Sequence, residues 1–264
     1  MKFRMTQWVA ASTLALGMLF GLTSMCAAAS LQDILGGKVV RIGAVNAPPW
    51  YQKDLRTNEW TGLVPDIAQA LFQSTGVNIE YIDTQWGTAV AGLQSDRFDL
   101  LGGFNNTPER AKAIDFTRPM GAHKIGILTL ANDAGRYATW DAVNSASVKL
   151  AAIDGSAAVT LLQPRLVKTQ WVIVPTSDAM QLELESGRAN ALLTNDIQMS
   201  QYIAKRGRGT MIIPTPVQEQ PTNIGLRKDR AALREWLDQR LDSLEKDGTL
   251  DRIWSKYIVQ ATKP

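Results

Sequence analysis

The stretch RFDLLGGFNNTPERAKAIDFTRPM, residues 97–120, decides the fold assignment of this chain. Residues 98–104 are typical of a buried strand that ends in a glycine pair, and a helix is expected to start at Pro108, with Thr107 as a good N-cap. Arg110 then stands in the first helical turn, where the helix dipole makes a cation mildly unfavourable. An anion opposite Arg110 would make that placement useful, because guanidinium and carboxylate groups pair bidentately. The alternative is a surface arginine or an internal ion pair.

Strand and helix patterns alternate outward from this stretch in two successive sets. The first set has strands at 38–45, 77–82, 98–104 and 124–130 and helices at 64–76, 86–97 and from 108. The second has strands at 148–153, 170–174, 189–194, 210–214 and 222–227 and helices to about 167, at 177–187, 195–207 and 229–248, and near 249–258. The proline-rich stretch 214–221 is expected to be a connection. This alternation predicts an α/β fold with parallel sheets covered by helices in two lobes. Ligands in such folds bind beyond the carboxyl ends of the strands, so a cleft between the lobes is the expected site.

The composition is that of an ordinary globular protein. The 264 residues are 45% hydrophobic and 20% charged, which suits one large or two small domains. No basic tract suggests a nucleic-acid partner, and no segment after the first 29 residues is long and apolar enough to cross a membrane.

The first 29 residues predict a cleavable secretory signal. Lys2 and Arg4 precede an apolar run, which is followed by small residues up to Ala29. The only cysteine, Cys26, lies within this segment and is expected to leave with it, so that a lipid-modified N-terminus is the less favoured alternative. The formal charge then falls from +3 to +1, because Lys2 and Arg4 leave with the segment. The mature chain would have no thiol for disulfides or catalysis.

Motifs that would indicate an enzyme or a metal site are missing from the sequence. It has one histidine, His123, which is expected to be structural, and no nucleophile-elbow motif, metal-binding cluster or phosphate-binding glycine loop. We therefore expect no catalytic residue, no metal and no cofactor.

Several longer stretches together resemble one known family. They are APPW (47–50), GLVPDIAQAL (62–71), the 97–120 stretch, VKLAAIDGSA (148–157), SGRANALLTND (186–196) and DGTLDRIWSKY (247–257). With them the chain resembles the periplasmic solute-binding proteins of ABC importers, in the group that binds polar amino acids. The resemblance implies a type II periplasmic-binding-protein fold with two α/β lobes and two crossing hinge strands.

The same resemblance implies lobe limits and a hinged closure on the ligand. Lobe 1 would comprise 30–126 and 219–264, lobe 2 would comprise 130–214, and the hinge connections would be 127–129 and 215–218.

The family pattern also implies ligand-binding residues. Arg110 matches the arginine that holds the ligand α-carboxylate, and the Gly155–Ser156 turn would add a second carboxylate contact from lobe 2. That turn opens a helix, whose N–H groups suit an anion, although a simple N-cap is the alternative. Trp86 aligns with an aromatic that packs on the ligand, and Trp50 lies near the ligand-facing loop; both could instead be packing residues.

Two departures from the family pattern affect the expected ligand. The loop before Arg110 is one residue shorter than usual, which leaves Gly103, Asn105, Asn106 and Thr107 as candidates for ligand contacts. Asn195 stands where many members have an aspartate that pairs with the ligand ammonium. Asp196 could substitute, but from a different helix position. An unpaired ammonium in a closed cleft is costly, so another carboxylate or small anion is an alternative to an amino acid.

The sequence therefore predicts a monomeric periplasmic protein that delivers a small anionic or zwitterionic solute to the membrane subunits of an ABC importer. Two alternatives stay open: a cyclohexadienyl-type dehydratase on the same fold, and a soluble accessory or sensory module.

Overall fold

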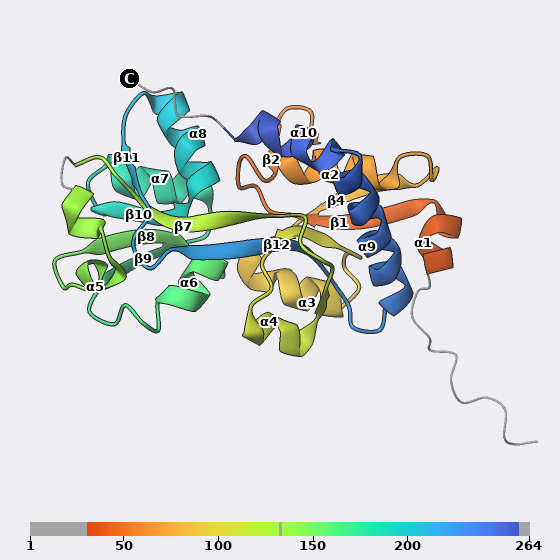
Figure 1. The fold of residues 1–264 in the computed structure, drawn as a ribbon, viewed down its shortest axis with the longest axis horizontal. Coiled ribbons are helices and arrows are strands. Elements are labelled where there is room, and N and C mark those ends of the chain that lie inside the picture. The colour runs from red at the N-terminus through yellow and green to blue at the C-terminus, as the bar shows by residue number, and fades with distance from the viewer. Residues whose placement is uncertain (1–30, 132–133, 259–264) are drawn as a thin grey trace, which may run out of the picture.

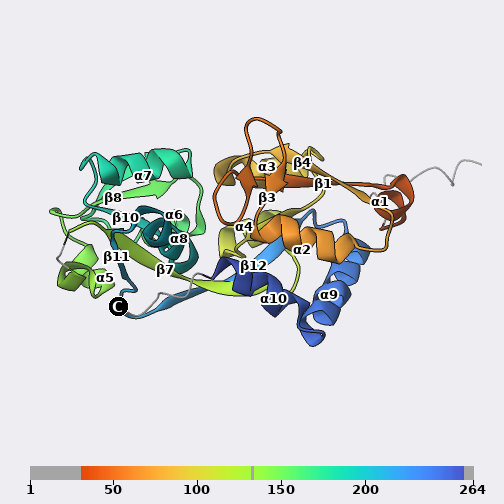
Figure 2. The same ribbon diagram turned by 90° about the horizontal axis from the view of Figure 1, so that it is seen from above.

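Two lobes lie side by side and are joined by two long strands. The computed structural model describes residues 31–131 and 134–258, so the expected signal segment and Cys26 lie outside the described residues. The chain begins in one lobe, crosses along β7 (Gly121–Thr129) and returns along β12 (Gln218–Leu226) (Figures 1 and 2). This is the two-lobed α/β architecture with two crossing strands that the sequence predicted. In the described part of the chain, no helix reaches the length and apolarity that a membrane span needs.

Lobe 1 combines the early part of the chain with its last two helices. Its elements are α1 (Leu31–Gly37), β1 (Val39–Ala44), β2 (Gln52–Lys53), β3 (Trp60–Thr61), α2 (Leu63–Phe72), β4 (Asn78–Asp83), the 3₁₀ helix η1 (Trp86–Thr88), α3 (Ala89–Gln94), β5 (Leu101–Phe104), α4 (Pro108–Ala113), β6 (Asp115–Phe116), α9 (Ala231–Lys246) and α10 (Thr249–Tyr257). β1 runs parallel to β4, and a parallel bridge from Ile42 to Leu100 joins β1 to the chain entering β5. β5 then pairs antiparallel with β12.

Lobe 2 is formed by the middle of the chain. Its elements are the 3₁₀ helix η2 (Ala134–Tyr137), α5 (Trp140–Val143), β8 (Lys149–Ile153), α6 (Ala157–Leu162), β9 (Gln170–Val174), α7 (Ser177–Glu185), β10 (Ala191–Asn195), α8 (Asp196–Arg206) and β11 (Thr210–Ile212). β8 is parallel to both β9 and β10, whereas β10 and β11 pair antiparallel with β7. The carboxyl ends of β8 and β10 lead directly into α6 and α8, whose N-termini border the cleft.

The crossing strands pair with each other between the lobes. The register runs from Gln218 opposite Ile125 to Thr222 opposite Gly121. The lobe limits given above, with hinges at 127–129 and 215–218, stay a prediction.

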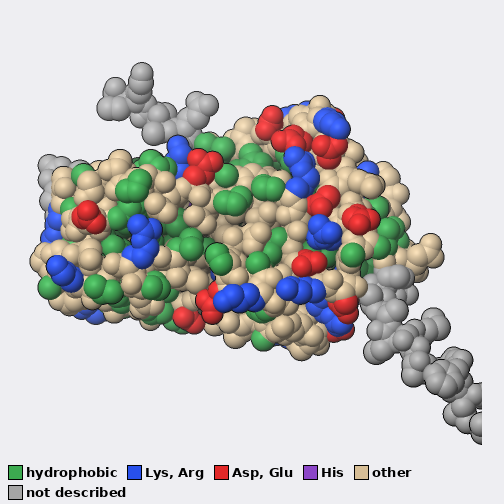
Figure 3. All heavy atoms as spheres, turned by 60° about the horizontal axis from the view of Figure 1, so that its bottom comes forward, with side chains coloured by type: hydrophobic (Ala, Val, Ile, Leu, Met, Phe, Trp, Pro, Cys, Tyr) green, Lys and Arg blue, Asp and Glu red, His purple; other side chains and the backbone are tan. Residues whose placement is uncertain are grey.

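The apolar patterns of the long elements match their burial. Leu233, Leu237, Leu241 and Leu244 of α9 form the buried stripe that faces the lobe 1 core. Charged side chains of both signs are interspersed on the visible face in Figure 3, without a broad field of one sign.

The structure corrects the expectation for residues 214–221. β12 begins at Gln218, inside the stretch expected to be a connection. Pro221 suggested a loop because it lacks an amide donor, but it lies opposite Ala122 in the ladder and its carbonyl oxygen accepts a hydrogen bond from Asn105. Hydrophobic periodicity also placed the end of α6 too late, at about residue 167. It did not predict α1, α5, β2, β3, β6 or η2.

A buried carboxylate ties three parts of lobe 1 together. Asp99 Oδ1 accepts hydrogen bonds from Arg230 Nη1 at 2.7 Å and Arg41 Nη2 at 2.8 Å, and Oδ2 accepts from the Arg41 backbone N–H at 2.9 Å. Burial alone would raise the pKa of Asp99, but the hydrogen bonds from Arg41 and Arg230 outweigh it and hold that pKa below its usual value. The cluster fixes β1, the turn before β5 and the start of α9 relative to one another.

Replacing Asp99 with Asn should lower the free energy of unfolding by about 1.5–3 kcal/mol near neutral pH, because the Arg230 side chain, 2% exposed, keeps its ion pair with Asp96 but loses the one with Asp99. Since folding lowers the Asp99 pKa, its stabilisation is present above the unfolded-state pKa of about 4 and is lost as the pH falls through the lower folded-state value. Urea unfolding at several pH values measures both effects.

The control is Asp242→Asn, which breaks an exposed pair with Lys246 and should leave the free energy of unfolding nearly unchanged. Equal losses in the two variants would contradict the role given to Asp99.

Candidate functional site

A small cavity lies between the lobes, on the inner face of the crossing strand β7. Its volume is about 60 Å³. The lining residues come from both lobes and from β7: Ala47, Trp50, Trp86, Gly103, Phe104, Asn105, Arg110, His123, Ile125, Ile153, Ser156, Ala157, Ala158, Leu193, Thr194, Asn195 and Gln198.

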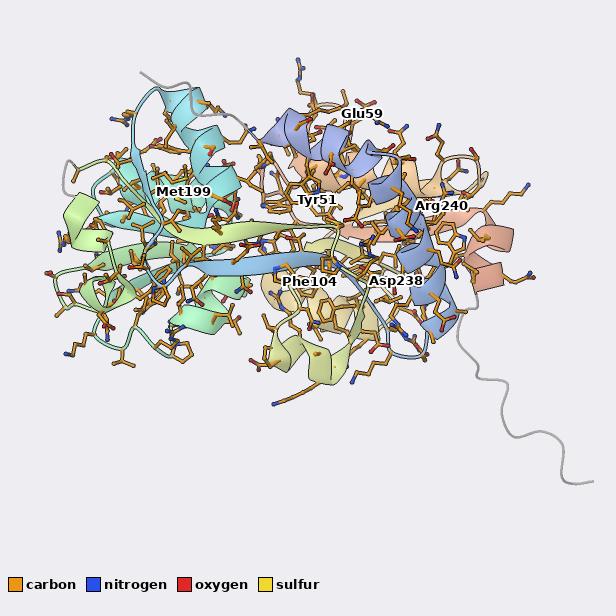
Figure 4. All side chains as sticks on the ribbon, in the orientation of Figure 1. Tyr51, Glu59, Phe104, Met199, Asp238 and Arg240 are labelled. Atoms are coloured by element: carbon orange, nitrogen blue, oxygen red, sulfur yellow. The ribbon has the colours of Figure 1, made fainter. Side chains whose placement is uncertain are left out.

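Arg110 is the charged group of this cavity, and α4 positions it. Thr107 caps the helix by accepting a hydrogen bond from the Arg110 backbone N–H, and the Arg110 guanidinium stacks 3.8 Å from the Phe104 ring centroid. Figure 4 shows Phe104 beside β12, near the border of the two lobes. Arg110 is 7% exposed, and this burial lowers its pKa to about 10, so it stays protonated at neutral pH.

The Arg110 guanidinium also connects the lobes. Nη1 donates to the Asn105 carbonyl at 2.9 Å, and Nη2 donates across the cleft to the Gly155 carbonyl at 2.7 Å. Both partners are neutral, although a buried guanidinium pairs more strongly with an ionised acceptor.

His123 lies on the floor of the cleft with a defined proton position. The side-chain amide of Asn105 donates to the Pro221 carbonyl at 2.8 Å and lies 3.0 Å from His123 Nε2. With the amide nitrogen as donor, Nε2 must accept, which assigns the proton of the neutral ring to Nδ1. His123 Nδ1 is buried and has no hydrogen-bond partner among the residues that the structure describes. Burial lowers the His123 pKa to about 4, so the ring is neutral at physiological pH.

Aromatic rings form the apolar wall on the lobe 1 side. Trp86 stacks on Phe104 with ring centroids 5.9 Å apart, and Trp50 packs edge-on against His123 at 5.5 Å. Trp50 also packs against Trp254 of α10, so it is part of the lobe 1 core as well as of the cavity wall.

Lobe 2 presents two helix starts to the cavity. Ser156 caps α6 and Asn195 caps α8, where Asn195 Oδ1 accepts from the Gln198 backbone N–H at 3.0 Å. The Gln198 side-chain oxygen accepts from Thr194 Oγ1 at 2.6 Å and from Asn195 Nδ2 at 2.8 Å. Gln198 Nε2 donates to the Pro48 carbonyl of lobe 1 at 3.3 Å, which makes a second contact between the lobes.

The structure brings most of the predicted site residues to the cavity. Those that line it are Trp50, Trp86, Gly103, Asn105, Arg110, Ser156 and Asn195; Asn106 does not. Their roles toward a ligand stay predictions.

Besides Asn106, three predicted residues do not line the cavity. Thr107 is buried as the cap of α4. Gly155 offers Arg110 its carbonyl, and the Ser156 N–H donates to the Ile153 carbonyl, so this turn does not present the pair of free N–H groups expected from the sequence. Asp196 is engaged instead by the Lys124 and Ile197 backbone N–H groups, at 3.1 and 3.0 Å.

The sequence prediction did not assign His123 or Gln198 to the site. His123 was expected to be structural, and its position in a crossing strand was the available signal. Gln198 follows Asn195 by one helical turn, but a polar residue there is as typical of a solvated helix face. In the described part of the chain, no three His, Cys, Asp or Glu residues cluster in a way that could hold a metal.

Two lobes joined by two crossing strands, with a small cavity between them, are the architecture of solute-binding proteins. A sequence profile of the bacterial extracellular solute-binding proteins, family 3, matches residues 40–260. The chain belongs to this family and is an extracytoplasmic solute-binding protein, as predicted.

Individual relatives agree with this assignment. The chain is 25% identical over 210 residues to a probable amino-acid ABC transporter-binding protein of Haemophilus influenzae, covering 77% of this chain and 79% of the relative. It is 20% identical over 221 residues to a cyclohexadienyl dehydratase of Pseudomonas aeruginosa, covering 83% and 82%. A crystal structure of AncCDT-1, an ancestral amino acid-binding protein and precursor of cyclohexadienyl dehydratase, superimposes with a TM-score of 0.79 at 27% identity, covering 87% and 99%. Relatives of this fold thus include binding proteins and an enzyme.

Nitrogen NMR of the single histidine tests the site geometry directly. His123 should show a proton on Nδ1 and should stay neutral until the pH approaches 4. Because the folded-state pKa lies below the unfolded value of about 6.5, stability should fall by about 3 kcal/mol as the pH drops from 6.5 to 4.

Long-range ¹H–¹⁵N correlation spectra report both the tautomer and the titration. Asn105→Ala should let the tautomer change, whereas the surface variant Lys205→Ala should not. A His123 ring that titrates near pH 6.5 in the folded protein would contradict the assignment.

Proposed function

We propose that this chain is the monomeric periplasmic binding component of an ABC importer and that it captures a small carboxylate with an uncharged remainder. The carboxylate pairs with Arg110, and the solute leaves unchanged. The family membership and the ABC-transporter relative support the importer role, and the expected signal segment supports export to the periplasm.

The proposed ligand class rests on the charges of the side chains that line the cavity. Among the described residues that line it, Arg110 is charged, His123 is neutral at physiological pH, and none is Asp or Glu. A carboxylate therefore meets its ionised partner, whereas an α-ammonium group would meet neutral acceptors. Enclosing an ammonium without an ionised partner is costly, so the zwitterion is the poorer ligand.

Arg110 also has partners that a carboxylate can improve on. Its present acceptors are the Asn105 and Gly155 carbonyls. A carboxylate bound bidentately would replace hydrogen bonds to neutral acceptors with two hydrogen bonds to an ionised one, which adds the attraction between opposite charges.

His123 adds a preference for an oxygen acceptor, rather than an ammonium group, on the carbon next to the carboxylate. Its Nδ1–H is a donor that lacks a partner among the described residues, and a buried donor gains from an acceptor. A hydroxyl or carbonyl oxygen can accept this proton, whereas an ammonium group has only donors. These observations favour 2-hydroxy or 2-oxo acids over 2-amino acids.

The size of the cavity limits the solute in this closed arrangement. The volume is about 60 Å³, and a water-sized group takes ~10–15 Å³, so the space suits on the order of five non-hydrogen atoms. Glycolate and lactate are of this size.

Calorimetry with isosteric pairs tests the function. Lactate should bind the mature protein at least about tenfold more tightly than alanine, and glycolate more tightly than glycine. Arg110→Gln should lose most of the lactate affinity, by about 2–3 kcal/mol, because it removes the ionised partner. Tighter binding of the amino acid in both pairs would refute the ligand class.

The same samples separate binding from catalysis. Proton NMR of the recovered solute should show unchanged lactate after prolonged incubation. Prephenate, a cyclohexadienyl acid, should likewise remain unconsumed; its turnover would favour the dehydratase that one relative exemplifies. Binding of no acid and no amino acid would favour an accessory role.

Closure of the lobes depends on a contact between two glycine backbones. A Cβ at Gly155 would lie 2.3 Å from the Gly87 Cα and backbone nitrogen, far inside contact distance. Gly155 also has φ +64°, a conformation that costs a side-chain-bearing residue about 1 kcal/mol. Only glycine lets lobe 2 approach η1 this closely.

Gly155→Ala should therefore block full closure and weaken lactate binding at least about tenfold, with a larger radius of gyration in saturating lactate. Gly187→Ala is the matched control, since Gly187 has φ +73° but no atom within 4 Å of the added Cβ. Both variants should lose similar stability, whereas only Gly155→Ala should lose compaction in small-angle scattering. Wild-type compaction in Gly155→Ala would rule out the backbone contact as a condition for closure.

A further inference from the structure

A second cavity lies beside the first and is about twice its size, at about 130 Å³ against 60 Å³. It is enclosed mainly by α7, β10 and α8 of lobe 2, and Pro48 and Gln52 of lobe 1 border it. Three of its lining side chains, Leu128, Met180 and Leu192, are apolar and at most 2% exposed. Charged residues of its lining are exposed, namely Asp178, Lys205 and Arg206. Uncharged polar side chains, among them Ser177, Gln181 and Gln201, complete the lining. The chamber thus has one buried apolar wall, polar sides and a charged rim.

The two cavities are neighbours that share a wall. Thr194 and Gln198 line both of them. Gln198 is half-buried, and its amide is held in place by Thr194, Asn195 and the Pro48 carbonyl. The side chain therefore occupies the boundary between the space at Arg110 and the larger chamber.

We propose that the second cavity is a subsite for the aliphatic tail of a longer carboxylate, and that Gln198 is the partition that determines the accepted chain length. This inference rests on the proposed function, since the carboxylate end remains on Arg110. When the Gln198 side chain rotates away, the tail passes Thr194 and reaches the apolar wall of Leu128, Met180 and Leu192.

The cost of opening the partition sets the selectivity. Rotation breaks the hydrogen bonds that Gln198 makes to Thr194, Asn195 and Pro48, each of which contributes a modest net stabilisation. Short acids leave these bonds intact. Long acids lose them and gain burial of the tail against the chamber.

Substitution of Gln198 separates the steric partition from its hydrogen bonds. Gln198→Ala removes both, whereas Gln198→Leu removes the hydrogen bonds but keeps bulk at the boundary. Ser200→Ala, on the same helix and outside both cavities, is the control. The measured quantity is the ratio of the association constants of 2-hydroxyoctanoate and lactate, in which any general loss of closure cancels.

Gln198→Ala should raise this ratio at least about tenfold over wild type. Gln198→Leu, which lacks the hydrogen bonds but keeps the bulk, should raise it clearly less, and Ser200→Ala should leave it within about threefold. An unchanged ratio in Gln198→Ala, or an equal rise in Gln198→Leu, would refute the role of the Gln198 side chain as a partition between the cavities.

A second measurement keeps the subsite testable if the ligand class is wrong. In Gln198→Ala protein labelled at the methionine methyl groups, 2-hydroxyoctanoate should shift the Met180 resonance, and lactate should not. Met199, which lines neither cavity, is the internal reference (Figure 4). Failure of lactate and glycolate to bind wild type refutes the proposed function, whereas an unmoved Met180 resonance in Gln198→Ala refutes the subsite.

Discussion

The hydrogen bonds of one buried guanidinium organise the cleft. Arg110 donates to Asn105 within its own lobe and to Gly155 in the other, so the group proposed to pair with an anion is also a contact between the lobes. Burial of this cation is tolerable because Phe104 stacks on it and two carbonyls accept from it. An anionic solute would exchange these neutral acceptors for an ionised one, which links binding to closure through a single side chain.

Local sequence rules explain why Arg110 could be predicted. The Thr107 cap and Pro108 fix where α4 begins, and this start aims the first-turn arginine into the cleft. Alternation of apolar residues likewise predicted the long elements, because a strand or helix that buries one face must repeat at its own period. The family motifs added the connection between Arg110 and a carboxylate, which spacing alone could not supply.

The rest of the site depends on contacts between distant segments, which a local pattern does not encode. His123 and Asn105 meet Pro221 only because β7 and β12 cross side by side. The first residues of β12 were concealed by Pro221 and by the prolines at 214 and 216 just before it, whose missing amide donors resemble a connection until the partner strand is known. Gln198 looks like any polar residue on a helix until Pro48 of the other lobe is placed against it.

Asn195 illustrates how the charge of a cavity can change while the fold does not. Its side-chain oxygen accepts from the Gln198 backbone N–H at the start of α8, which is the capping bond that an aspartate would also make. Asparagine therefore preserves the helix start and removes only the negative charge. Its amide nitrogen, which an aspartate lacks, donates to the Gln198 side chain and holds the partition beside the second cavity. One change of residue type thus alters both the charge offered to a solute and the wall that limits its length.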